Sequence, residues 1–138
     1  MTLVDAGPLI ALIDKGQGVV HRRCLEAQRG LTGPLLTTWS CFTEAMYFLG
    51  HLGGWRGQKA LWNFLSRSAL IVHAPSLGEI ERMQALMEKY EDVPMDLADA
   101  SLVALAEVSG LKKIFSLDHD FYVYRIGGKD SFDVIPEG

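Results

Sequence analysis

Residues 95–107, MDLADASLVALAE, are apolar on nearly every side of the helix that they predict. A helix of this kind has to be buried, so the chain must fold around it with a substantial core. Buried helices rarely carry carboxylates without a partner, yet Asp96 and Asp99 stand at the start of this one. The segment therefore predicts an interior helix whose first turn has a use for two acids.

The rest of the chain alternates between short apolar runs and amphipathic segments. Strands are predicted within 32–38 and over 2–5, 69–74, 112–117 and 132–136. Helices are predicted from a first turn that contains Pro8 to about Ile13, and over 18–29, 40–52, 55–65, 76–90 and 95–109, with a turn or short helix over 118–124. This alternation indicates an α/β fold, a three-layer sandwich around a mainly parallel sheet. The length of 138 residues fits one domain over 1–138.

The composition is that of an ordinary globular protein, with 49% hydrophobic and 22% charged residues. No apolar run is long enough for a membrane span, and the first residues lack the basic start of a signal peptide. We therefore expect a cytoplasmic protein, with no membrane partner, in which Cys24 and Cys41 are reduced. His21 and Cys24 lie three residues apart, but no second ligand pair supports a zinc site. The net charge of −4 argues against generic capture of nucleic acid and is compatible with a local basic rim.

Two further aspartates follow predicted strands. Asp5 ends the strand over 2–5, and Asp118 follows the one over 112–117. In parallel sheets, ligand sites gather at the carboxyl ends of the strands. A purely structural role explains Asp5 least well, because aspartate has no preference for the end of a buried strand. The sheet is thus predicted to present two carboxylates where a ligand site is expected.

The other acids have ordinary structural explanations as well. Asp96 can cap its helix, and Asp99 can complete a capping-box-like pair. If Asp96 caps, Asp99 remains free to point at the strand ends. Glu44 lies on a largely apolar helix side and can be a glutamate at the rim of the fold. Asp118 and Asp120 can be turn residues, because aspartate favours turns.

These separate explanations leave out the repulsion that the acids would exert on one another if they lay close together. Two carboxylates about 4 Å apart repel by about 4 kcal/mol at an effective dielectric constant of 20. A cluster of three or four would cost a large fraction of the roughly 5–15 kcal/mol that stabilises a domain. Either the acids share protons or a cation neutralises them. An all-oxygen ligand set points to Mg²⁺ or Mn²⁺ rather than zinc.

Four segments, in order along nearly the whole chain, carry a family resemblance: LVDAGPLIAL, TTWSCFTEAMYFL, MDLADASLVALAE and IFSLDHDF. Together they resemble the PIN-domain ribonucleases of the VapC toxin type. By this resemblance Asp5, Glu44, Asp99 and Asp118 correspond to the four acidic site positions of that family. Asp96 belongs to a common variant of the third segment, and the resemblance implies that it caps the helix or supports the ligands from outside.

The resemblance implies a PIN-like α/β fold and a metal-dependent endoribonuclease that hydrolyses RNA phosphodiester bonds with Mg²⁺ or Mn²⁺. Asp5, Glu44 and Asp99 would hold the ion or position its water, and Asp118 would complete a second, weaker site. It also implies a toxin of a toxin–antitoxin pair, a homodimer with a cognate antitoxin as partner. Arg125, after the fourth segment, is either a phosphate contact or an ordinary surface arginine.

Two departures from the family pattern keep alternatives open. Many members have a hydroxyl residue directly after the first aspartate, where this chain has Ala6. Ser116, in place of the usual threonine, keeps its hydroxyl. The loss at Ala6 motivates an alternative, a catalytically inactive PIN-like module whose acidic pocket receives a basic side chain of a partner. A phospho-receiver or aspartyl-phosphatase domain is the other alternative, but the phosphatase type needs an acid at the position of Gly7.

Overall fold

The computed structural model describes residues 1–138 and contains one five-stranded sheet. Its strand order is β3-β2-β1-β4-β7, and every neighbouring pair is parallel. The strands are β1 (Thr2–Val4), β2 (Leu35–Thr38), β3 (Leu70–His73), β4 (Lys113–Phe115) and β7 (Asp133–Ile135). The order reverses between β1 and β4, because the chain adds strands on one side of β1 and then on the other. Ligand sites of parallel α/β sheets are found at such a switch point.

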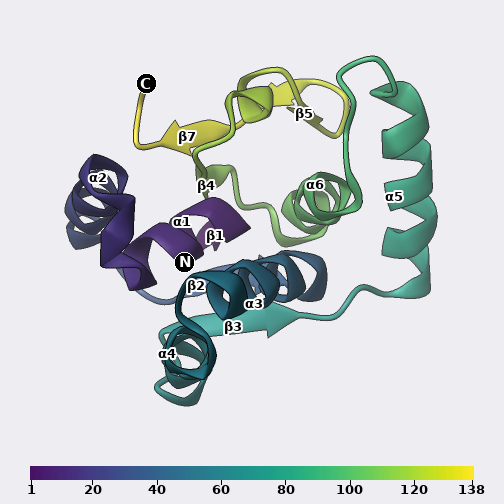
Figure 1. The fold of residues 1–138 in the computed structure, drawn as a ribbon. Coiled ribbons are helices and arrows are strands. Elements are labelled where there is room, and N and C mark those ends of the chain that lie inside the picture. The colour runs from purple at the N-terminus through teal and green to yellow at the C-terminus, as the bar shows by residue number, and fades with distance from the viewer.

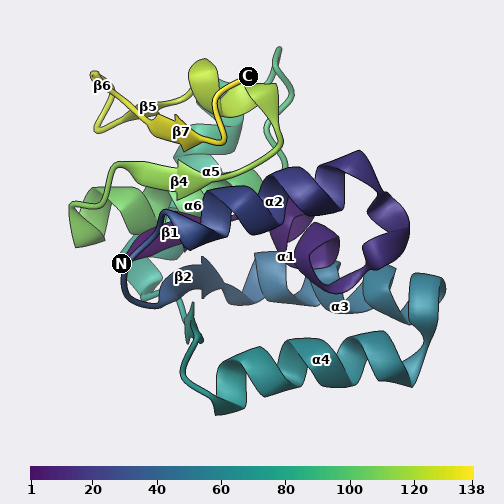
Figure 2. The same ribbon diagram turned by 90° about the vertical axis from the view of Figure 1, so that its left-hand side faces the viewer.

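Helices cover both faces of this sheet, which confirms the predicted α/β sandwich (Figure 1). Figure 2 shows α2 and α1 in front of the strands, with α5 and α6 behind them. The helices are α1 (Ala6–Ile13), α2 (Val19–Arg29), α3 (Trp39–Gly53), α4 (Trp55–Ser66), α5 (Leu77–Lys89) and α6 (Leu97–Ser109). Two short 3-10 helices, η1 (Lys15–Gln17) and η2 (His119–Tyr122), complete the helical content. None of the helices is long and apolar enough to cross a membrane.

The side chains of each strand point alternately to the two faces of the sheet, and this divides the interior into two hydrophobic clusters. Leu3 and Ile114 face the cluster that contains α5 and α6. Val4 and Phe115, the next residues on β1 and β4, face the cluster that contains α1, α3 and α4. Successive side chains of a strand point to opposite faces, so each central strand serves both clusters. Parallel sheets covered on both faces have continuous apolar strands for this reason.

Helix α6 is the interior helix that the sequence predicts. All nine residues from Ala98 to Ala106 are buried. The helix ends at Gly110, which has a φ of +75° and so adopts the left-handed conformation that glycine tolerates. Burial on every side explains why this segment shows no polar face.

The structure differs from the prediction mainly after β4. A two-stranded antiparallel hairpin, β5 (Arg125–Ile126) and β6 (Asp130–Ser131), was not predicted, because two-residue strands carry too few side chains for a period. The predicted strand over 112–117 is only three residues long, since the chain bends at Leu117. The predicted turn or short helix over 118–124 is confirmed as η2.

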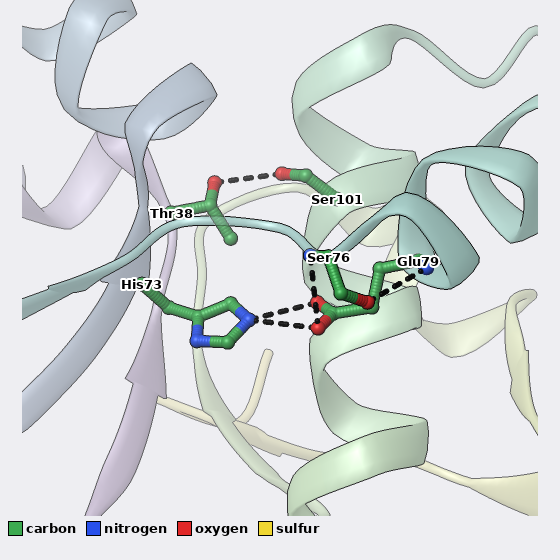
Figure 3. A network of polar contacts seen from close by, with 5 residues as sticks. All are labelled: Thr38, His73, Ser76, Glu79 and Ser101. Atoms are coloured by element: carbon green, nitrogen blue, oxygen red, sulfur yellow. Dashed lines mark hydrogen bonds and ion pairs between the residues drawn. The ribbon is translucent and has the colours of Figure 1, made fainter.

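Polar contacts from the last residues of β2 and β3 hold α5 and α6 against the sheet (Figure 3). The Nε2 atom of His73 lies 2.8 Å from a carboxylate oxygen of Glu79, in the first turn of α5. Ser76 caps α5 in a capping box with Glu79. On the neighbouring strand, the hydroxyl of Thr38 lies 2.7 Å from the hydroxyl of Ser101 on α6. These contacts place the N-terminal ends of both helices at the carboxyl edge of the sheet.

Candidate metal centre

Three aspartates that are far apart in the sequence meet at the carboxyl edge of the sheet. One carboxylate oxygen from each of Asp5, Asp99 and Asp118 lies within 4.8 Å of the other two. Asp5 directly follows β1, Asp118 follows the adjacent β4, and Asp99 comes from the first turn of α6. The structure therefore brings together three of the four acids that the resemblance assigns to the site.

Asp5 has a structural role that the sequence analysis did not assign. Its Oδ1 accepts a hydrogen bond of 2.8 Å from the backbone N–H of Ala6, so Asp5 caps α1. The helix begins two residues before Pro8, directly at the end of β1, and this places a capping position on the strand terminus. The expectation that Asp5 gains nothing from local structure is wrong for this reason.

Asp96 caps α6 as predicted, but Asp99 also takes part in the capping box. The Oδ1 of Asp96 accepts from the backbone N–H of Asp99 at 2.8 Å. In return, the Oδ2 of Asp99 accepts from the backbone N–H of Asp96 at 3.3 Å. The capping box thus uses one oxygen of Asp99 while the carboxylate remains part of the cluster. The two roles that the sequence presents as alternatives coexist in one side chain.

Ser116 connects two of the acids. Its hydroxyl donates to Oδ2 of Asp5 at 3.0 Å and accepts from the backbone N–H of Asp118 at 3.0 Å. Asp118 also behaves as the turn residue that its sequence context suggests, because its Oδ1 accepts from the backbone N–H of Asp120 at 2.9 Å. A hydroxyl at position 116 therefore holds the first and fourth acids in a fixed relation.

Two residues at the site were missed by sequence reasoning. The hydroxyl of Tyr124 donates to Oδ2 of Asp99 at 3.0 Å. The thiol of Cys41 lies 3.8 Å from Oδ1 of Asp5. Burial, and then Asp5, raise the pKa of Cys41 far above its usual range, so the thiol stays a protonated donor. No motif or spacing marks either residue, because each reaches its acid only through the tertiary fold.

The cluster has no compensating positive charge. No ion pair of the structure involves Asp5, Asp99 or Asp118. Burial raises the pKa of Asp5, with smaller contributions from Asp118 and Asp96. Burial and the charge of Asp96 raise the pKa of Asp99 to about 7. Near neutral pH the protein therefore holds carboxylates in a place that disfavours their charge.

Part of this carboxylate surface remains open. Oδ1 of Asp99 and Oδ2 of Asp118 accept no hydrogen bond from the protein. Every fully buried side-chain oxygen and nitrogen in the structure has a hydrogen-bond partner. These two oxygens must therefore reach solvent. Three converging carboxylates, two of them with an open oxygen, and no nitrogen or thiolate ligand suit a hard divalent cation such as Mg²⁺ or Mn²⁺.

Glu44 lies near this group but is not part of the 4.8 Å cluster. Burial raises its pKa, followed by the charges of Asp5, Asp96 and Asp118, so it lies within electrostatic reach of the cluster. It lines a separate groove of about 720 Å³, between the first half of α3 and the start of α6. Aromatic and aliphatic side chains form much of that groove, among them Trp39, Tyr47 and Leu97.

Other candidate residues from the sequence have different roles. His21 lies against the backbone of α1, with its Nδ1 near the carbonyl of Ala11. Cys24 and Cys41 are both buried and unbonded to each other, as expected. The guanidinium of Arg125 donates to three carbonyl groups of its own loop, which include those of Tyr122 and Val123. Arg125 therefore braces the segment after η2.

The comparison with known families agrees with this geometry. The family model described as "PIN domain" matches residues 2–127. The chain belongs to the PIN-domain family. This membership confirms the resemblance seen in the sequence and sets aside the phospho-receiver and phosphatase alternatives. No curated protein matches the chain.

Two solved structures share the fold of this PIN domain. VapC20 of Mycobacterium tuberculosis, a toxin that cleaves the sarcin–ricin loop, superposes with a TM-score of 0.81 at 16% identity. The match covers 89% of this chain and 94% of that one. A chain of a toxin–antitoxin complex from Klebsiella pneumoniae gives a TM-score of 0.66 at 20% identity, over 88% of this chain and 90% of that one. At these identities the matches establish a common fold.

Proposed function

We propose that this protein is a Mg²⁺- or Mn²⁺-dependent endoribonuclease, the toxin of a toxin–antitoxin pair. The observation that carries the proposal is the convergence of Asp5, Asp99 and Asp118 within 4.8 Å, without a basic partner, at the switch point of a PIN fold. A structural cluster of caps would have no reason to concentrate uncompensated charge at that point. The fold that it shares with VapC20, a toxin that cleaves RNA in the sarcin–ricin loop, supports the substrate class.

In this proposal Asp5, Asp99 and Asp118 bind the cation. A bound divalent cation supplies an activated water and offsets charge on the phosphate. Ser116 keeps the carboxylates of Asp5 and Asp118 in register through its hydroxyl. Glu44, outside the tight cluster, is assigned to the positioning of water or of a more distant ion. Asp96 is assigned to capping α6.

The test is hydrolysis of single-stranded or loop RNA by the purified protein. We expect cleavage with Mg²⁺ or Mn²⁺ and none with EDTA. Asp5→Asn protein, purified in parallel, controls for a contaminating nuclease and should be inactive. Metal-independent cleavage, or equal cleavage by the variant, would refute the assignment.

The inactive PIN-like module remains the second candidate, because Ala6 lacks the hydroxyl that many relatives carry next to the first acid. In that case the acids would receive a basic side chain of a partner. A folded, pure protein that binds such a partner but hydrolyses no RNA with either metal would favour this candidate.

The proposed antitoxin would occupy the groove between α3 and α6. Apolar side chains there can receive an amphipathic helix, and Glu44 and Asp96 at the same groove can bind an arginine through its planar fork. The complex from Klebsiella pneumoniae supports a partner of this class. We expect a small basic protein, encoded next to this one, to co-purify and to inhibit RNA cleavage.

The proposed homodimer needs a second apolar surface. Exposed aromatic and aliphatic side chains at the end of α3 and on α4 offer one, including Phe48, Leu52 and Trp55. Light scattering of the purified protein should give twice the mass of the chain. A monomer at micromolar concentration would remove the homodimer from the proposal without affecting the metal centre.

A further inference from the structure

The two oxygens of Asp99 have unequal surroundings. Oδ2 accepts two hydrogen bonds, from the hydroxyl of Tyr124 at 3.0 Å and from the backbone N–H of Asp96 at 3.3 Å. Oδ1 accepts none and reaches solvent, since no fully buried side-chain oxygen lacks a partner. The protein therefore holds one oxygen of this carboxylate and leaves the other open to solvent.

Tyr124 is held rigidly enough to impose this orientation. Its side chain is fully buried, between η2 and β5. Its ring packs edge-on against Phe121, with a centroid distance of 5.2 Å, and against Tyr90 at 5.1 Å. A ring fixed on two sides aims its hydroxyl at one point.

We propose that Tyr124 is a positioning residue of the metal centre, which holds Oδ2 of Asp99 and leaves Oδ1 as the oxygen that binds the cation. This inference rests on the proposed metal-dependent function. A carboxylate that is free to turn can offer either oxygen or both, and the ligand geometry is then set only when the cation arrives. Two donors on one oxygen fix the carboxylate plane beforehand. Partners of metal ligands elsewhere act in this way and are costly to remove.

The variant Tyr124→Phe deletes the hydroxyl and keeps the ring that packs against Phe121 and Tyr90. Tyr90→Phe is the matched control, because it deletes the hydroxyl of a neighbouring half-buried ring, keeps the ring that packs against Tyr124, and removes no hydrogen bond to an acid of the cluster. We expect calorimetric titration with Mn²⁺ to show roughly 10- to 100-fold weaker binding for Tyr124→Phe. Tyr90→Phe should bind Mn²⁺ like the wild type. Thermal melts in EDTA show whether each variant is folded.

A second measurement needs no folded Tyr124→Phe protein. Wild-type protein labelled with ¹³C at the tyrosine Cζ atoms gives one NMR signal for each of its four tyrosines. Mg²⁺ draws charge from Asp99, so the hydrogen bond from Tyr124 and its Cζ shift should change as Mg²⁺ is added. The Tyr90 signal should stay in place. Substitution of the other three tyrosines by phenylalanine assigns the signals.

The outcomes separate the two levels of the hypothesis. Folded Tyr124→Phe with wild-type Mn²⁺ affinity, or a Tyr124 signal that ignores saturating Mg²⁺, would overturn the positioning role alone. A wild-type protein that binds neither Mn²⁺ nor Mg²⁺ would overturn the proposed function and this inference with it. Weaker Mn²⁺ binding by Tyr124→Phe alone, together with a selective Tyr124 shift, would establish the role.

Discussion

Helices α5 and α6 begin with the same local motif in opposite electrostatic surroundings. Each has a capping box, formed by Ser76 and Glu79 in α5 and by Asp96 and Asp99 in α6. The acid at the third helical position is buried in both, with 8% of Glu79 and 6% of Asp99 exposed. Backbone hydrogen bonding alone would assign the two acids the same role.

What differs is the partner that the fold supplies. Glu79 lies 2.8 Å from Nε2 of His73, so an imidazole stands beside it as a partner (Figure 3). Asp99 instead meets Asp5 and Asp118 and has no basic neighbour in an ion pair. A buried acid with a partner supports structure, whereas a buried acid among other acids has to keep a proton or bind a cation. The difference between these partners supports the proposed metal-binding role of Asp99, which the capping box alone does not indicate.

The largest difference between the two acids is expected in activity. Asp99→Asn should lower RNA cleavage on the order of 10²–10³-fold, as loss of a preorganised charge at a reacting phosphate does. Glu79→Gln, the matched change in α5, should retain activity close to wild type, because Glu79 contacts His73 and is not one of the three clustered acids. Initial rates on one RNA substrate at saturating Mn²⁺ measure both. Similar losses of cleavage rate in the two variants would contradict the different roles proposed for Asp99 and Glu79.

The second largest difference between the Asp99 and Glu79 variants is expected in how far Mn²⁺ stabilises them. At a free concentration a hundredfold above Kd, Mn²⁺ should stabilise the wild type by about 2.7 kcal/mol. Glu79→Gln should gain the same amount from a lower starting point, and Asp99→Asn much less. Thermal melts with EDTA and with millimolar Mn²⁺ measure the gain. A wild type that ignores Mn²⁺ would contradict the metal centre itself.

The stability of the metal-free protein should depend on pH through Asp99. Its pKa is raised by burial from 3.8 to about 7. Between these values the folded protein keeps a proton that the unfolded chain has released, so stability falls as the pH rises. The loss is at most about 1.4 kcal/mol per pH unit for one such group.

Asp99→Asn should lack this share of the pH dependence and melt above the wild type at pH 7 in EDTA. Melting curves between pH 4 and pH 8 test this expectation. Glu79→Gln serves as the control and should melt lower than the wild type at pH 7, because it weakens the contact with His73. A lower melting temperature for Asp99→Asn at pH 7 would mean that capping outweighs repulsion.

The smallest effects concern the two capping residues. Ser76→Ala and Asp96→Ala each remove a side-chain cap, which costs about 1 kcal/mol of unfolding free energy. Asp96→Ala also removes a negative charge that raises the pKa of Asp5 and Asp99, so part of its cost is offset. Urea unfolding in EDTA should therefore show the smaller loss for Asp96→Ala. A larger loss of unfolding free energy for Asp96→Ala than for Ser76→Ala would show that the charge of Asp96 does not destabilise the cluster.

Much of the fold follows from local features of the sequence. The burial of α6, its cap at Asp96 and its end at Gly110 are all visible in residues 95–110. The alternation of strands and helices indicates the parallel sandwich, because amphipathic helices need a sheet to cover. The short hairpin after η2 is not visible, since two-residue strands have no period to detect.

Local sequence is enough to predict which acids stand at strand ends and helix starts, because capping and strand termination depend on neighbours in the chain. The convergence of Asp5, Asp99 and Asp118, with Glu44 outside the cluster, is visible only in the folded protein. So is the hydrogen bond from Tyr124, a residue without any motif, to Asp99. Electrostatic coupling depends on distance in space, and the fold brings Asp5 close to two acids that lie more than ninety positions further along the chain.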